Sequence, residues 1–326
     1  MKQKNSFSGQ IGFVFAAAGS AVGVGNLWRF PYLAAKDGGG LFLLIYLVLV
    51  LTVGFVLLTT DIAIGRKTGK SAIYAYESMQ KKWKFLGVIT FLVPVLIMTY
   101  YAVIGGWILR YIVIYLTSSG KQAVADNCFT SFISSPSSVW YGLIFMFLTA
   151  LIVYNGVEKG IERVSKFIMP VLLIMVIGIA IFSLTLKTTL DDGTVRTGLQ
   201  GLKVYMKPDL TGITIGRFLQ ITLDAMSQLF FSLSVSMGIM ITYGSYVKKD
   251  VDLNKAVSQI EIMDTGVAFL AGVMIIPAVF VFSGLDGMSA GPGLMFVSLP
   301  KVFYCMGVVG RIIGILFFVL AGFAAL

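Results

Sequence analysis

The chain has 326 residues, of which 57% are hydrophobic and 12% are charged, and its mean hydropathy is +0.91. About a quarter of the residues in a soluble domain are charged, so this composition excludes that class and indicates a protein that crosses a membrane several times. The net charge of +10 does not predict nucleic-acid binding, because the basic residues lie between long apolar runs and form no basic face.

The residue types present also exclude several kinds of chemistry. The sequence has no histidine and two cysteines, so neither a zinc site nor a Ser-His-Asp triad is expected. The full G-x-x-x-x-G-K-[ST] pattern is absent, which disfavours a pump driven by ATP. We expect no enzyme activity, no organic cofactor and no obligate protein partner. Cys128 and Cys305 both fall in segments expected outside, where they either form a disulfide or remain two unpaired small apolar side chains.

Eight apolar segments approach or exceed the roughly 20 residues that a helix needs to cross the bilayer. They lie at residues 11–35, 41–65, 85–116, 138–155, 161–186, 214–245, 255–283 and 308–326. No soluble domain is visible between them, so residues 1–326 are expected to form one transmembrane domain. The last segment stops at Leu326 in mid-membrane, where open carbonyls are unfavourable. We therefore expect a truncated gene product, a shortened chain or an incomplete sequence.

The loops between these segments predict the orientation of the chain. With the N-terminus inside, the tail and the inner loops would hold 14 of the 25 basic residues in short stretches. These inner loops are residues 66–84, 156–166 and 246–255. Because an excess of Lys and Arg in short loops marks the cytoplasmic side, we expect a cytoplasmic N-terminus in a bacterial inner membrane.

The first segment contains features that an ordinary spanning helix lacks. Gly23 and Gly25 lie near the middle of the apolar run, and each glycine weakens a helix by about 1 kcal/mol relative to alanine. Close helix packing would explain the glycines but explains Asn26 and Arg29 poorly, since a charge at mid-bilayer costs about 2.5–3.5 kcal/mol. A helix broken near residues 22–24 explains all four, because its free carbonyls bind a cation and its half-helix N-terminus attracts an anion.

A second interruption is expected within segment 214–245. Residues 231–238 read Phe-Ser-Leu-Ser-Val-Ser-Met-Gly, and alternate serines next to glycine suit an unwound stretch. Each serine could instead bond back to its own helix. Two interrupted spans, one opening each half of a repeat, are the pattern expected of a transporter site between inverted repeats.

The residues from Gly19 to Pro31, followed by Gly38–Gly40, resemble the first helix of the neurotransmitter:sodium symporter family, whose bacterial members are amino-acid transporters. Tyr100-Tyr101, residues 230–234 and residues 241–250 extend the resemblance over essentially the whole chain. It implies an all-α integral membrane protein with a five-plus-five inverted-repeat, leucine-transporter-like fold. The first repeat would span about 11–186, and a partial second repeat about 214–326, truncated in the eighth helix.

The resemblance also implies a substrate site. Backbone groups of the broken first helix would hold the two charged ends of an amino acid, the Tyr101 hydroxyl would donate to its carboxylate, and Phe231 would cover it. Gly23 stands where monoamine transporters have aspartate, so an amino acid fits better than an amine. The residues implied for substrate binding are Ala21, Gly23, Val24, Gly25, Ile97, Tyr101, Phe231, Ser232, Ser234 and Met237.

Two sodium sites are implied in the same way, so one or two sodium ions are expected. The first would use Ala21, Asn26, Ser232 and Asp264, whose oxygens suit a hard cation. The second would use the carbonyls of Gly19, Val22 and Ala324, and its remaining hydroxyl ligands would follow Leu326. Asp264 lies in mid-span where many relatives have asparagine. Its carboxylate could supply the negative charge that chloride supplies in other members, which predicts chloride independence.

Gating residues complete the expectations. Arg29, Tyr101 and Phe231 would close the outer side, and Lys4 would act at the inner gate, although the acids expected to pair with Arg29 and Lys4 are missing. The fifth apolar segment, 161–186, is called segment five below. The spacing from Gly160 to Pro170 predicts that it unwinds at its start and admits water, or only that it is kinked.

The sequence thus predicts a sodium-coupled symporter that imports an amino acid across a lipid bilayer, and the expected substrate is a hydrophobic amino acid. Ile97 and Met237 give the pocket a flexible apolar lining, which is the basis for that substrate class. Two alternatives stay open: a nonfunctional truncated fragment, and a sensor or channel on the same scaffold.

Overall fold

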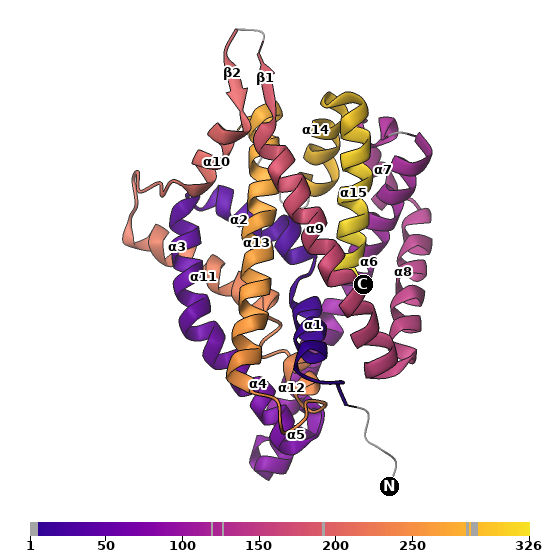
Figure 1. Cartoon of the computed structure of the whole chain (residues 1–326), viewed down its shortest axis with the longest axis vertical. Coiled ribbons are helices and arrows are strands. Elements are labelled where there is room, and N and C mark those ends of the chain that lie inside the picture. The colour runs from indigo at the N-terminus through magenta and orange to yellow at the C-terminus, as the bar shows by residue number, and fades with distance from the viewer. Residues whose placement is uncertain (1–5, 119, 126, 191–192, 285–286, 288–292) are drawn as a thin grey trace.

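The computed structural model describes residues 6–118, 120–125, 127–190, 193–284, 287 and 293–326. These residues form an elongated bundle of helices (Figure 1). Within them, six helical stretches are long and apolar enough to cross a membrane, and a bent pair makes a seventh. The six are Gly40–Thr68, Lys81–Ser118, Ser137–Tyr154, Val157–Thr185, Leu253–Ser283 and Gly307–Ala325.

The first span is the bent pair. Helix α1 (Gln10–Ala21) ends at the predicted break, and the chain resumes as a π-helical turn η1 (Gly25–Arg29) and helix α2 (Phe30–Lys36). The two halves are bent by 53°. The break expected near residues 22–24 is therefore present.

The rest of the first half follows the predicted segments closely. It is made of α3 (Gly40–Leu49), η2 (Val50–Gly54), α4 (Phe55–Thr68), α5 (Ala72–Met79), η3 (Lys81–Trp83), α6 (Lys84–Ser118), η4 (Lys121–Val124), α7 (Cys128–Ile133), α8 (Ser137–Tyr154), η5 (Val157–Glu162) and α9 (Arg163–Thr185). Segment five opens with the π-helical turn η5, whereas α9 continues without interruption through Pro170.

The second half contains the second interrupted segment. It is made of β1 (Lys187–Thr189), β2 (Val195–Thr197), α10 (Gly198–Met206), α11 (Ile215–Ser232), α12 (Ile239–Gly244), α13 (Leu253–Ser283), η7 (Leu294–Ser298), α14 (Leu299–Cys305) and α15 (Gly307–Ala325). The chain between α11 and α12 is not helical. Segment 214–245 is not among the six uninterrupted stretches, because α11 carries Arg217 and Asp224 and α12 has six residues.

The parts predicted as outer loops contain structure that hydropathy does not reveal. The short antiparallel pair β1–β2 projects from one end of the bundle and leads into α10, while α14 lies beside α15 (Figure 1). A two-stranded hairpin and helices of nine and seven residues are too short to span a bilayer. The all-α description is therefore accurate for the spans, with this hairpin as an addition.

The core lies around α13, which packs against α1, α2, α4, α9 and α10. In Figure 1 this long helix runs through the middle of the bundle, with α6 and α8 at one side. Helices α6 and α8 carry many exposed large apolar side chains, among them Phe91, Leu96, Trp140 and Phe147. A chain in water would not expose such faces, whereas a lipid bilayer covers them.

The two cysteines do not form a disulfide. Cys128 is half-buried and Cys305 is exposed, and both are free thiols. Of the two interpretations left open by the sequence, the structure therefore has two unpaired cysteines.

Candidate functional site

The first break exposes backbone in the middle of a span. The regular helical bonds of α1 stop with the Val22 N–H, which donates to Ala18 O at 2.7 Å. The Gly23 N–H donates to Ala21 O at 2.9 Å and to Asn26 Oδ1 at 3.4 Å. This tight turn directs the chain away from the α1 axis, which is the geometry that leaves peptide groups available to a ligand.

The second break has an unusual backbone that a buried acid supports. Ser234 and Ser236 have φ angles of 52° and 60°, and Gly238 has 74°. Left-handed conformations are uncommon for residues with a Cβ, so two serines there need support from their surroundings. The Ser236 N–H donates to Asp61 Oδ2 of α4 at 2.7 Å. A bond to a carboxylate is stronger than a neutral one, so Asp61 holds the unwound stretch in place.

Asn26, Ser232 and Asp264 meet between the two breaks. Asn26 Nδ2 donates to Asp264 Oδ1 at 2.8 Å, and Ser232 Oγ donates to Asp264 Oδ1 and Oδ2 at 2.8 and 2.9 Å. Ser232 Oγ also lies 3.2 Å from Asn26 Oδ1. Their exposed fractions are 0%, 2% and 0%. The structure thus brings together the three side chains predicted for the first sodium site.

This cluster offers oxygen atoms that suit a sodium ion. A carboxylate, an amide oxygen and a hydroxyl are hard ligands, and a hard cation prefers them. A buried carboxylate without a positive partner is costly, and the described contacts of Asp264 are an amide and a hydroxyl, both neutral. A cation would therefore complete the charge balance of the cluster.

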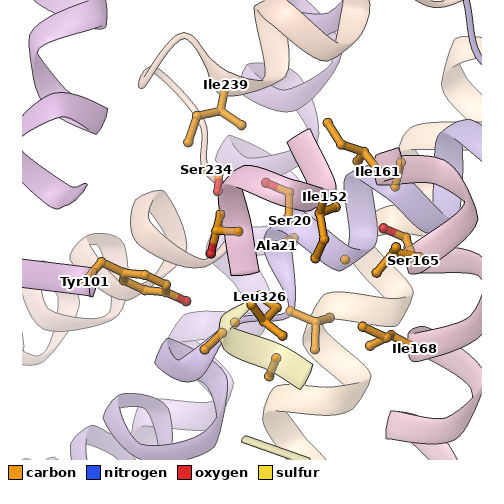
Figure 2. A pocket seen from close by; sticks show the side chains of 18 of the residues that line it. Ser20, Ala21, Tyr101, Ile152, Ile161, Ser165, Ile168, Ser234, Ile239 and Leu326 are labelled. Carbon is orange, nitrogen blue, oxygen red and sulfur yellow. The ribbon is translucent and has the colours of Figure 1, made fainter. Parts of the chain in front are cut away.

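A cavity of about 480 Å³, within the usual range for small-molecule sites, is lined by Gly23, Phe231 and Ser234, which are close in the chain to Asn26 and Ser232. Asn26, Ser232 and Asp264 themselves do not line it. Several residues predicted for substrate or for the second sodium share its wall: Gly19, Ala21, Val22, Gly23, Ile97, Tyr101, Phe231, Ser234, Met237 and Ala324. Figure 2 shows the Tyr101 hydroxyl directed into the cavity, with Ser234 and Leu326 on its walls. A Cβ added at Gly23 would lie 3.1 Å from that hydroxyl.

A second hollow of about 640 Å³ lies beyond Tyr101 and Phe231. Tyr101, Phe231 and Met237 line both spaces, so these side chains stand between the two. Arg29 and Val24 line the second hollow but not the first cavity. The predicted outer-gate residues are therefore placed at a partition.

Arg29 is held against the second interrupted segment. Its guanidinium donates to Gln228 Oε1 at 3.0 Å and to Ser227 Oγ at 2.8 Å, and lies 5.7 Å from the centre of the Phe231 ring. Gly25 packs against the same ring, since a Cβ there would lie 2.6 Å from Phe231 Cε1. The two interrupted spans are thus in direct contact at the partition.

Two ion pairs also join these spans at their far ends. Lys36 Nζ lies 2.9 Å from Asp224 Oδ2, and Arg217 Nη2 lies 2.9 Å from Asp37 Oδ1. The side chain of Asp37 is fully buried, whereas that of Arg217 is 40% exposed. Helices α2 and α11 are therefore tied together along their length.

Other predicted residues lie elsewhere or cannot be placed. Gly160 is buried in the turn η5, where a Cβ would overlap the Ile152 carbonyl, and Pro170 lies inside α9. Neither lines the cavity, although Ile161 and Ser165 between them do. Lys4 lies outside the described residues.

Sequence reasoning missed three polar residues next to the site. Asp61 supports the second break, Glu261 lies one turn before Asp264 with a buried Oε1, and Gln228 Nε2 donates to Gly25 O at 3.4 Å. All three are polar side chains inside segments predicted to cross the membrane, and intramembrane polar groups are usually functional. That signal would have identified them.

Comparison with known proteins decides the family. The sequence profile described as the Sodium:neurotransmitter symporter family matches residues 4–136 and 129–326. The chain belongs to the sodium:neurotransmitter symporter family. The resemblance noted from residues Gly19 to Pro31 is thereby confirmed.

Two of the relatives that the chain matches in sequence are bacterial proteins. The chain is 39% identical over 308 residues to the uncharacterized sodium-dependent transporter YhdH of Bacillus subtilis, covering 91% of this chain and 64% of that protein. It is 33% identical to an uncharacterized sodium-dependent transporter of Haemophilus influenzae, covering 100% of this chain and 71% of that one. It therefore spans about two-thirds of the length of these symporter-family relatives.

A solved structure confirms the fold. The crystal structure of MhsT in complex with L-phenylalanine matches with a TM-score of 0.85 and 38% identity, covering 99% of this chain and 71% of that one. This symporter-family protein thus has the leucine-transporter-like membrane fold that its sequence predicts.

Proposed function

We propose that this protein is a sodium-coupled symporter that imports a hydrophobic amino acid by alternating access. The observation that carries the proposal is the convergence of Asn26, Ser232 and Asp264 at the two helix breaks, beside a cavity of about 480 Å³. The amino acid bound to the structural neighbour MhsT is phenylalanine, which supports the same substrate class here.

The first sodium ion would sit in the polar cluster. Asn26 Oδ1, Ser232 Oγ, the Asp264 carboxylate and the Ala21 carbonyl would provide its protein ligands. Because the Asp264 carboxylate already supplies a negative charge, the site needs no chloride. The carbonyls of Gly19, Val22 and Ala324 would hold a second sodium, since these three residues share the wall of the same cavity.

The amino acid would occupy the cavity with its carboxylate near Tyr101. The half-helix that begins after the first break offers N–H groups to that carboxylate. Ile97, Met237 and Phe231 line the cavity and would contact the apolar side chain, with Met237 adapting to its shape. The Val24, Gly25 and Ser234 backbones would complete the site.

Binding of sodium and amino acid would be coupled. A carboxylate in the middle of a membrane is unfavourable unless a cation neutralises it, and the cation gains an oxygen ligand from the substrate. Each therefore raises the affinity for the other by the same factor. One charge moving through 100 mV releases about 2.3 kcal/mol, which at about 1.4 kcal/mol per tenfold drives roughly fifty-fold accumulation.

Access would alternate around this fixed site. Tyr101, Phe231 and Arg29 would open and close the partition toward the outer hollow, while α2 and α11 move together through their ion pairs. On the inner side the turn around Gly160 and the kink at Pro170 would let segment five unwind. We place the protein in a bacterial inner membrane with a cytoplasmic N-terminus, in which the two repeats span about 11–186 and 214–326.

The test is uptake by the protein reconstituted in liposomes. We expect accumulation of radiolabelled phenylalanine when sodium is high outside, none when potassium replaces sodium, and no change when gluconate replaces chloride. Alanine and glutamate as competitors would define the side-chain class. Binding without accumulation would contradict the transport proposal and favour a sensor.

A further inference from the structure

Glu162 is a buried acid that the proposed binding site does not use. It ends the turn η5 at the start of segment five, and its side chain is 2% exposed. Glu158, four residues earlier in the same turn, is exposed. A carboxylate buried at such a position needs bonding partners; one of them, Lys166, is local, and the other, Ser8, lies in a remote part of the chain.

The Glu162 carboxylate holds the residues that precede α1. The Ser8 N–H donates to Oε2 at 2.9 Å, and the Ser8 hydroxyl donates to Oε1. Lys166, one turn further along segment five, lies 2.6 Å from Glu162 Oε1 and 3.0 Å from Ser8 Oγ. Lys248 donates to the Ser8 carbonyl at 3.0 Å. One exposed serine is therefore bonded by three side chains.

The same stretch is packed as well as bonded. Phe7 is 1% exposed, its N–H donates to Tyr246 O at 3.2 Å, and its ring lies 5.5 Å from that of Phe13 and 6.0 Å from that of Tyr243. Gly12 leaves room for the carboxylate, because a Cβ there would overlap Glu162 Oε1. The close approach of α1 to segment five thus requires glycine, which has no side chain, at position 12.

These contacts join two walls of the central cavity. Gly19 and Ser20 of α1 line one side, and Ile161 and Ser165 of segment five line another. Figure 2 shows Ser20 and Ser165 across this space. Any opening of the cavity between α1 and segment five must therefore separate Ser8 from Glu162.

We infer that Glu162 is a positioning residue that couples the start of α1 to the opening turn of segment five, so that both are released in one step. The inference rests on the proposed alternating access, in which these two walls separate to release sodium. Because Glu162 contacts neither predicted sodium ligand set, its role is to hold the inner side closed.

Hydrogen exchange followed by mass spectrometry tests this coupling on the purified protein in detergent, without sodium or amino acid. In Glu162→Gln we expect exchange to rise about tenfold both in residues 6–13 and in residues 157–166, since a bond to a charged acceptor is lost. Glu158→Gln, the same change at an exposed site, is the control and should stay within about twofold of the unmodified protein.

Gly12→Ala is a second variant that displaces the carboxylate without removing a charge. It should raise exchange in the same two stretches and leave α13 unchanged. Faster exchange in residues 6–13 alone, equal exchange in Glu162→Gln and Glu158→Gln, or a uniform rise that includes α13 would each overturn the inference. Since no sodium or substrate is present, these results are independent of whether phenylalanine uptake is observed.

Discussion

Asp264 carries the charge of the proposed sodium site, and its environment makes it dependent on a cation. It is fully buried, and its described side-chain bonds come from Asn26 and Ser232, which are both neutral. Sodium binding would therefore relieve an unfavourable buried charge as well as form ligand bonds.

Replacing Asp264 tests this at the level of one functional group. Asp264→Asn keeps an oxygen ligand but removes the negative charge, so we expect sodium affinity to fall at least tenfold, equivalent to about 1.4 kcal/mol. The sodium affinity of each variant is measured by following phenylalanine binding as the sodium concentration is raised. The exposed Asp250→Asn is the matched control, and equal sodium affinity in both variants would argue against Asp264 as a ligand.

Adding a single Cβ atom at Gly25 should weaken substrate binding. A Cβ there would lie 2.6 Å from Phe231 Cε1, so Gly25→Ala must displace the ring that covers the cavity. We expect the Kd for phenylalanine to rise about tenfold. Gly178→Ala in α9 meets no atom within 4 Å and should leave the Kd unchanged. If both variants bind alike, Phe231 does not cover the substrate.

Single residues of the site could be predicted where a polar or charged side chain lies in a membrane-spanning segment, because such a side chain is unfavourable there. Asn26 and Asp264 stand out in apolar runs, and Tyr101 and Phe231 followed from the family resemblance. Glu162 was not identified, because it falls within the predicted inner loop 156–166, where an acid is ordinary. Its burial depends on Ser8, which lies 154 residues away in the sequence, and no local pattern reveals such a contact.

At the scale of elements, the two interrupted spans are stabilised in different ways. At the first break, Gly23 and Gly25 let two side chains approach the backbone, because a Cβ would lie 3.1 Å from the Tyr101 hydroxyl or 2.6 Å from Phe231 Cε1. The second break places Ser234 and Ser236 in the left-handed region and therefore relies on Asp61. Local composition indicated both breaks, whereas the acid that supports the second one lies on another helix.

Removing that acid should weaken the second break. In Asp61→Ala the Ser236 N–H loses its carboxylate acceptor, and a hydrogen bond to a charged group contributes about 1.5–3 kcal/mol, so the melting temperature in detergent should fall by a few degrees. Thr60→Val, on the exposed side of the same helix, is the control. A melting temperature equal to that of the control would contradict the supporting role of Asp61.

Predicted elements differ most from the structure where segments are short. Hydropathy located the ends of α6, α8, α13 and α15 within about three residues, because a long apolar run has few alternatives in a membrane. The hairpin β1–β2 and helix α14 were not predicted, since stretches of this length carry no span signal. The hairpin and α14 both pack against α13.

At the scale of the whole molecule, the fold and the family could be predicted, and the orientation remains a prediction from charge. The basic loops place the N-terminus inside. In a chain with both native cysteines replaced by alanine, we expect an impermeant maleimide to label Leu199→Cys but not Lys81→Cys in intact cells; both positions are exposed. Labelling of Lys81→Cys alone would reverse the orientation.

The central claim is that the two broken spans hold a sodium ion and an amino acid side by side. Isothermal titration of phenylalanine into the purified protein at several sodium concentrations, with sodium titrated in turn at several phenylalanine concentrations, tests it most directly. The account predicts that each ligand lowers the Kd of the other by the same factor, at least tenfold, and that Asn26→Ala abolishes this effect. Equal phenylalanine affinity in sodium and in potassium would contradict it.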